Sequence, residues 1–253
     1  MNELSEVNRR VSWRYLFYGQ LSHGLLVLVL VPGAIALAEP GLTGRMVWGL
    51  SDRQWAYGLV AVAVTHQVLV WLLWRLQLCF GTLSRWLGRA DLVVWSLMFF
   101  PLLVARPLLT AAVAVSSAGS LTMPIWVAIP LGAVLLGPAL YTFWSVQQYF
   151  GLLRAAGGDH FRARYWTMPL VHQGAFRYSG NAMYSFGFLA LWAIAVWGRS
   201  RPALALALFQ HAYIWVHLYC TEAPDLALLY GATPPVPEPP DPSAPEAANA
   251  KDH

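Results

Sequence analysis

Two polar segments in the second half of the chain carry residue types that could do chemistry. Residues 172–184 read His-Gln-Gly-Ala-Phe-Arg-Tyr-Ser-Gly-Asn-Ala-Met-Tyr, and Thr221 and Glu222 follow the last long apolar stretch. A carboxylate or a tyrosine can relay a proton, and an arginine can hold a phosphate group. The two segments therefore indicate a site for a polar ligand at the edge of an apolar region.

The composition indicates that lipid surrounds most of the chain. Of its 253 residues, 58% are hydrophobic and only 11% are charged, whereas about a quarter of the residues in a soluble domain are charged. The 13 tryptophans fit a protein whose amphipathic rings lie at the level of lipid headgroups. No basic cluster interleaves with aromatic residues, so nothing indicates a nucleic-acid surface. We predict an all-α integral membrane protein.

Apolar stretches divide the chain into helices that could cross a bilayer. A spanning helix needs about 20 apolar residues, and we expect about six spans, at residues 13–38, 55–80, 92–115, 123–150, 182–198 and 202–220. Only three residues separate the last two, which predicts a tight C-terminal helical hairpin. Arg75, near the end of the second span, is expected to extend its side chain toward the headgroups. Ala36-Leu37-Ala38 resembles a signal-peptidase site, but we expect this first stretch to remain as an anchor.

We divide the chain into three parts. Residues 1–120 hold the first three membrane helices, and residues 121–232 hold helices four to six with the polar segment 151–181. Residues 233–253 are rich in proline and small polar residues and are expected to form a disordered tail.

The arginines predict the orientation in the membrane, because cytosolic loops carry an excess of lysine and arginine. One side of the predicted bundle holds both chain ends and Arg9, Arg10, Arg14, Arg75, Arg85, Arg89, Arg154, Arg162, Arg164 and Arg177. The other side holds Arg45, Arg53, Arg199 and Arg201, and Arg106 could add to it. We therefore expect both termini and the segment 151–181 on the cytosolic face of the cytoplasmic or an internal membrane.

The predicted hairpin brings the two polar segments together. Tyr184 begins one of its helices and Glu222 ends the other, so the two should be neighbours although they are 38 positions apart. Each residue alone has a simpler explanation. Glu222 could mark the edge of the membrane, Arg177 could extend to the interface, and Tyr178 could belong to an aromatic belt. Their convergence at one hairpin mouth favours a site.

Residues 174–184 resemble the signature of a family of membrane methyltransferases that act on isoprenylcysteine carboxyl groups or on phosphatidylethanolamine. That signature reads roughly Gly-Pro-Tyr-Arg-Tyr-Val-Arg-His-Pro-Met-Tyr, followed by a helical hairpin and a Glu-Glu pair. The matching positions are Gly174, Arg177, Tyr178, Met183 and Tyr184, with Phe176 as a conservative replacement and Asn181 at the histidine position as in the phospholipid branch. Thr221-Glu222 stands at the acidic pair, and the resemblance covers residues 141–231.

The chain departs from this signature at three positions. Gly180 replaces the second arginine, Ala182 replaces the proline, and Thr221 replaces the first glutamate. These departures bear on the substrate more than on the fold. The missing arginine in particular argues against a prenylcysteine carboxylate as the methyl acceptor.

The resemblance implies S-adenosylmethionine as the methyl donor, bound over the last helices at the cytosolic face. It places four residues at this cofactor, namely Tyr178, Asn181, Tyr184 and Glu222, with Tyr184 and Glu222 as the candidate catalytic pair. Glu222 could hold the ammonium group of the cofactor. His172 is expected at the cofactor or at a lipid phosphate.

The expected acceptor is a membrane lipid, preferably a phospholipid amine such as phosphatidylethanolamine. Arg154, Arg164 and Arg177 are the candidate ligands of its phosphate, because arginine forks suit phosphate. The basic residues of 154–164 could equally serve only the orientation of the protein in the membrane. Isoprenylcysteine, a small thiol or a sterol-reductase-like reaction is the alternative on the same scaffold.

Two other classes of protein stay open. His23 and His66 could bind a haem between them, whereas His211 and His217 are six positions apart and do not share a helix face. A transporter or a non-catalytic scaffold is the second class, although no pair of carboxylates lies in mid-membrane. The two cysteines, Cys79 and Cys220, form no Cys-x-x-Cys motif, so no metal site is expected. The sequence indicates no oligomeric state.

Overall fold

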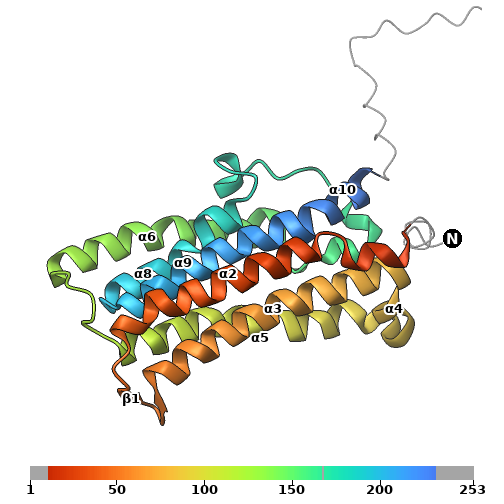
Figure 1. Ribbon diagram of the computed structural model, residues 1–253. Coiled ribbons are helices and arrows are strands. Elements are labelled where there is room, and N and C mark those ends of the chain that lie inside the picture. Colours follow the sequence, from red (N-terminus) through yellow and green to blue (C-terminus); the bar gives the residue numbers. More distant parts are fainter. Residues whose placement is uncertain (1–10, 167, 232–253) are drawn as a thin grey trace, which may run out of the picture.

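A computed structural model describes residues 11–166 and 168–231, which form a bundle of long helices lying side by side (Figure 1). The predicted all-α membrane bundle is thus confirmed. The proline-rich stretch expected to be a disordered tail, residues 233–253, lies outside the described residues.

The first half of the bundle holds three long helices. They are α2 (Gln20–Ala38), α3 (Asp52–Phe80) and α5 (Asp91–Ser116). Shorter elements connect them: η1 (Trp13–Phe17), η2 (Glu39–Gly41), β1 (Met46–Val47), β2 (Leu50–Ser51), α4 (Thr82–Leu87) and η3 (Gly88–Ala90). The two strands pair antiparallel, with Met46 opposite Ser51.

The second half holds α6 (Ile125–Ser145), α8 (Leu189–Trp197) and α9 (Arg201–His217). Three π-helical segments extend them, η4 (Val146–Phe150), η8 (Met183–Gly187) and η9 (Leu218–Glu222), and α10 (Ala223–Gly231) follows η9. Short turns build the polar segment between α6 and α8: α7 (Leu152–Ala155), η5 (Gly158–His160), η6 (Ala163–Tyr165) and η7 (Gly174–Arg177).

Local sequence signals explain where the main helices begin and end. Ser51 caps α3 by accepting from the Gln54 amide, and the Gln54 side chain reaches back to Ser51 in a capping box. Gly81 ends α3 in the left-handed conformation. Ser200 caps α9, and Pro202 lies in its first turn, where the missing N–H has no cost.

Five of the described helical stretches are long and apolar enough to cross a membrane. They are Trp13–Gly41, Asp52–Phe80, Thr82–Ser116, Ile125–Phe150 and Arg201–Gly231. The expected fifth span is shorter than these, because its apolar helix covers only Met183–Trp197. A helix of that length rises about 22 Å, less than the roughly 30 Å of the hydrocarbon core.

Different connecting segments lie at the two ends of the bundle. The described chain begins and ends at the same end, where Tyr15, Leu78 and Leu229 pack together and where α4 and α10 also lie (Figure 1). The strand hairpin lies at the opposite end. There the turn after α5 is tied to the turn before α9, since the Leu121 amide donates to the Arg199 carbonyl at 2.8 Å.

Small residues allow the helices of the bundle to pack closely. Ala34, Ala38, Ala56, Ala63 and Ala203 lie in one buried cluster at the contacts of α2, α3 and α9. Helix association in lipid depends on such close packing, because lipid tails are as apolar as leucine. Large apolar side chains such as Leu21 and Leu28 stay exposed on the outside, where lipid would cover them.

Candidate functional site

Tyr184 and Glu222 meet at the mouth of the hairpin formed by α8 and α9. The Tyr184 hydroxyl donates a hydrogen bond to Glu222 Oε2, which confirms that the two residues are neighbours. Tyr184 lies in the π-helical segment η8 and Glu222 in the π-helical segment η9. Single π-helical turns often occur at functional sites.

A pocket of about 360 Å³ lies just before the entry to this hairpin, and neither Tyr184 nor Glu222 lines it. Its lining residues are Phe150, Arg154, Leu170, Val171, His172, Phe176, Arg177, Tyr178, Ser179 and Gly180. We call it the basic pocket. Arg177 and His172 are exposed and have no hydrogen-bonded or ionic partner among the described residues. Both side chains could therefore bind an anion that enters from water.

The structure gathers only some of the expected site residues. Arg154, His172, Arg177 and Tyr178 line the basic pocket, with Tyr178 73% exposed. Arg164 does not line it, because its guanidinium lies over the Tyr165 ring and donates to the Tyr165 hydroxyl at 3.1 Å.

Asn181 does not line the basic pocket either. Its side chain is exposed, and its backbone amide donates a hydrogen bond to the Ser179 hydroxyl at 3.2 Å. Asn181 therefore helps to shape the turn that enters η8.

Close contacts hold the segment 174–178 against the end of α6. The Ala175 amide donates to Ser145 Oγ at 2.9 Å, and the rings of Phe150 and Phe176 stack at 5.2 Å. Gly174 has a φ of +60°, and a Cβ at this position would collide with Ser145. The glycine of the signature is thus required both by its conformation and by this contact.

Contacts within the protein hold the Arg154 side chain in place. Its guanidinium lies 4.9 Å from the centre of the Phe150 ring and donates to the Pro169 carbonyl at 3.3 Å and to the Tyr230 hydroxyl at 3.2 Å. Tyr230 in turn donates to Asp159 at 2.6 Å. Arg154 therefore stabilises the wall of the basic pocket as well as carrying its charge.

A buried ionic network that the sequence did not predict lies next to Glu222. Asp225, one helical turn after Glu222, pairs with Arg75 of α3 with Nε and Oδ1 2.5 Å apart, and both side chains are fully buried. Asp225 also accepts from the Tyr15 hydroxyl at 2.9 Å and contacts His160 Nε2 at 3.3 Å. The expectation that Arg75 extends to the headgroups is therefore wrong, because a buried carboxylate holds it inside.

The first helices also hold the backbone that precedes Glu222. Arg75 Nη2 donates to the Thr221 carbonyl at 3.3 Å. Gln20 of α2 donates to the Thr221 hydroxyl at 3.2 Å and to the Cys220 carbonyl at 3.4 Å. The position of Glu222 thus depends on α2 and α3. An acidic residue three positions after Glu222 was the signal in the sequence that could have indicated this network.

The segment 151–166 is fastened to α5. Arg162 Nη2 lies 2.5 Å from Asp91 Oδ1, and the hydrogen bond to this carboxylate raises the pKa of Arg162. Trp95 Nε1 donates to the Ala156 carbonyl at 2.6 Å. These contacts give Arg162 a structural role.

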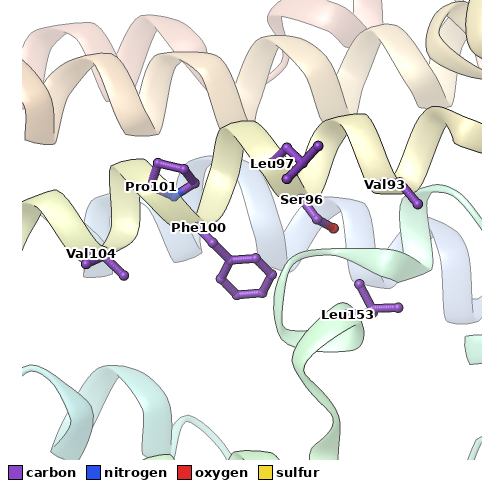
Figure 2. A pocket seen from close by; sticks show the side chains of 7 residues that line it. All are labelled: Val93, Ser96, Leu97, Phe100, Pro101, Val104 and Leu153. Atoms are coloured by element: carbon purple, nitrogen blue, oxygen red, sulfur yellow. The ribbon is translucent and has the colours of Figure 1, made fainter.

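A second, apolar pocket of about 510 Å³ lies on the outer face of α5. Figure 2 shows its lining: Val93, Ser96, Leu97, Phe100, Pro101 and Val104 of α5, facing Leu153 of α7. The hydroxyl of its one polar lining residue, Ser96, already donates to the Leu92 carbonyl at 2.7 Å. We call it the apolar groove, and its lining suits hydrocarbon.

The arrangement around His23 disfavours haem. Its Nδ1 contacts Gln20 Oε1 at 2.9 Å and its Nε2 contacts the Tyr213 hydroxyl at 3.0 Å, so neither ring nitrogen is left for iron. Among the described residues, no group of three or more histidine, cysteine, aspartate or glutamate side chains could hold a metal ion.

The comparison with known families concerns the part of the chain that carries Tyr184, Glu222 and the basic pocket. Residues 127–233 match the phospholipid methyltransferase family. This region begins in α6 and includes both Tyr184 and Glu222, whereas α2, α3 and α5 lie before it. Searches of curated proteins and of solved structures gave no match. The resemblance in the sequence is thus confirmed for this region, and a methyltransferase family implies S-adenosylmethionine as the donor.

Proposed function

We propose that the protein transfers a methyl group from S-adenosylmethionine to the headgroup amine of a membrane phospholipid such as phosphatidylethanolamine. The observation that carries this proposal is the Tyr184–Glu222 pair, which lies at the hairpin mouth within the region of the family match. The family match supports methyl transfer, and the two pockets support a lipid as the acceptor.

Tyr184 and Glu222 fit a cofactor that carries an ammonium group. Glu222 forms a hydrogen bond with Tyr184 but has no ion pair with an arginine in the described part of the chain. Its carboxylate can therefore hold an added cation. When bound, S-adenosylmethionine would supply a methyl group on a sulfonium, with a neutral thioether as the leaving group.

The lipid amine must lose a proton, because a protonated amine has no lone pair with which to attack. Glu222 can accept this proton, directly or through the Tyr184 hydroxyl. The remaining task of the protein is to align the amine with the methyl carbon and to exclude water. Tyr184 and Glu222 are partly buried and lie near the open basic pocket, which suits that task.

The two pockets suit the two parts of a phospholipid. Arg177 and His172 in the basic pocket can hold the phosphate, and the apolar groove can take an acyl chain. Leu153 lines the groove and Arg154 lines the basic pocket, so consecutive residues of α7 separate the two. A small thiol would need neither the groove nor the phosphate site.

We also propose that the end of the bundle with the basic pocket faces the cytosol. Arg85, Arg89, Arg162 and Arg177 belong to connections on the side that the arginine excess assigns to the cytosol. The donor is charged and arrives from water, whereas a phospholipid arrives sideways from the bilayer. The two can meet at this interface.

The decisive experiment measures binding of S-adenosylmethionine to detergent-purified protein by titration calorimetry, followed by methyl transfer to phosphatidylethanolamine. We expect saturable binding in the wild type and its loss in Glu222→Gln. Glu39→Gln is the matched control, since Glu39 is an exposed glutamate paired with Arg53 outside the site. Folded wild-type protein that binds no S-adenosylmethionine would refute the proposed function.

A further inference from the structure

Helices α3, α5 and α9 carry buried polar side chains in the interior of the bundle, outside the basic pocket. The buried members of this group are His66, Gln67 and Trp74 of α3, Arg106 and Thr110 of α5, and Gln210, Tyr213 and His217 of α9. Ionisable side chains inside membrane bundles are costly and usually mark a functional site.

Arg106 is the central charge of this group. It is only 2% exposed, and no carboxylate pairs with it among the described residues. Its Nε donates to Gln210 Oε1 at 3.0 Å, and Gln210 Nε2 donates to the Thr110 hydroxyl at 3.1 Å. These contacts fix the guanidinium in place, while Nη2 is buried without a partner.

The two histidines of this group that interact with this charge also lack partners. Both ring nitrogens of His66 and Nδ1 of His217 are buried without hydrogen bonds among the described residues. His217 lies close enough to His66 and Arg106 to interact with them electrostatically. Buried polar groups are nearly always hydrogen-bonded in folded proteins, so the unpartnered atoms of Arg106, His66 and His217 together indicate a ligand.

The chemistry of the unpartnered atoms defines the ligand. Arg106 Nη2 can only donate, and a neutral histidine offers one donor and one acceptor. A group that satisfies them must therefore be rich in acceptors, and the charge of Arg106 favours a negative one. Carboxylate and phosphate groups match an arginine in both respects.

We propose that Arg106, His66 and His217 form an internal oxyanion site, which binds the carboxylate or phosphate group of a free ion or of a membrane amphiphile. The site is distinct from the methyl-transfer site, because Glu222 would repel an anion. Arg106 and His66 precede residues 127–233, so the family match does not account for them.

The internal oxyanion site nevertheless adjoins the proposed methyltransferase site. The Arg106 guanidinium lies 4.9 Å from the centre of the Phe188 ring, and Phe188 follows Tyr184 by one helical turn. On the other side, the ring of His217 lies 5.7 Å from that of Trp74. Trp74 stacks on His160 at 4.2 Å, and His160 contacts Asp225. An anion bound at Arg106 would thus lie close to the residues that hold Tyr184 and Glu222 in place.

The test is thermal unfolding of the full-length protein in micelles of a nonionic detergent that carries no phosphate or carboxylate group, in a chloride buffer. Sodium acetate and sodium phosphate are the free probes, and oleate and phosphatidic acid are the membrane probes. We expect at least one probe to raise the unfolding midpoint of the wild type by about 5 °C or more at roughly 100 times its Kd. A shift with free probes identifies an ion from water, and a shift with membrane probes alone identifies an amphiphile.

The variant Arg106→Met should lose this shift, whereas the control Arg53→Met should retain it, because Arg53 forms an exposed pair with Glu39. If Arg106→Met does not fold, His66→Phe and His217→Phe should each weaken binding at least severalfold. The proposal is overturned if no probe shifts folded wild type, or if the shift persists in the folded variants. Neither result would affect the binding of S-adenosylmethionine, so the two proposals can fail separately.

Discussion

Arg75 and Asp225 form a fully buried ion pair, with Nε and Oδ1 2.5 Å apart, between α3 and α10. Asp225 follows Glu222 by one helical turn, and Arg75 also donates to the carbonyl of Thr221. A helix that lies before the family region thus fixes the backbone on both sides of Glu222. We infer that the N-terminal helices position the proposed cofactor ligand.

Arg75→Met should destabilise the protein by about 3–5 kcal/mol, because it leaves the carboxylate of Asp225 buried without its cation. The double variant Arg75→Met/Asp225→Leu should recover most of this loss, since it removes both charges. Chemical unfolding in detergent measures both values. The exposed pair offers the control: Arg53→Met should cost no more than about 1 kcal/mol. Equal losses for Arg75→Met and Arg53→Met would contradict the structural role of the buried pair.

Tyr184→Phe should weaken the affinity for S-adenosylmethionine about tenfold or more, because it removes the hydrogen bond that orients the Glu222 carboxylate. Titration calorimetry measures this affinity, and single-turnover methyl transfer measures the chemical step. Tyr219→Phe is the matched control in the segment η9, where Tyr219 is exposed and stacks on Trp215. Unchanged affinity and unchanged turnover in Tyr184→Phe would remove this tyrosine from the site.

Arg177→Gln should raise KM for phosphatidylethanolamine about tenfold while leaving the affinity for S-adenosylmethionine unchanged, since we place Arg177 at the phosphate of the lipid. Arg164→Gln should leave KM unchanged, because Arg164 contacts Tyr165 and does not line the basic pocket. A loss of cofactor affinity in Arg177→Gln would instead assign this arginine to the donor.

Leu97→Trp should fill part of the apolar groove and raise KM for a long-chain phosphatidylethanolamine more than for a short-chain one. Leu21→Trp adds the same ring to an exposed position of α2, away from the groove, and should change neither value. Equal effects of Leu97→Trp on both lipids would mean that the groove does not hold an acyl chain.

Cysteines introduced at the two ends of the bundle should react from opposite sides of the membrane. Gly180→Cys in the basic pocket should react with an impermeant maleimide only when the cytosolic side is open, and Leu121→Cys only from the other side. The native Cys79 and Cys220 are buried and should remain unlabelled. The reverse pattern would place the basic pocket outside the cytosol.

The sequence was sufficient for the membrane bundle and for the adjacency of Tyr184 and Glu222, because both follow from apolar length and a three-residue turn. It was not sufficient for the partners of Arg75 or for the unpaired Arg106. Those depend on how each helix is rotated about its axis, and helices that are apolar on most faces leave little periodicity from which to read the rotation. The predicted stretch 182–198 covers η8 and α8 together, but the change from π-helix to α-helix within it was not predicted.

The number of residues in the π-helical segment η9 determines the direction in which the residues after it face. A π turn holds the equivalent of one residue more than a regular turn, so the residues after it face a direction that an uninterrupted α9 would not give them. Deleting one residue from Leu218–Glu222 would restore a regular helix and swing Asp225 about 100° away from Arg75. In descendants of this gene, single-residue insertions and deletions here should therefore be rarer than substitutions at the same positions.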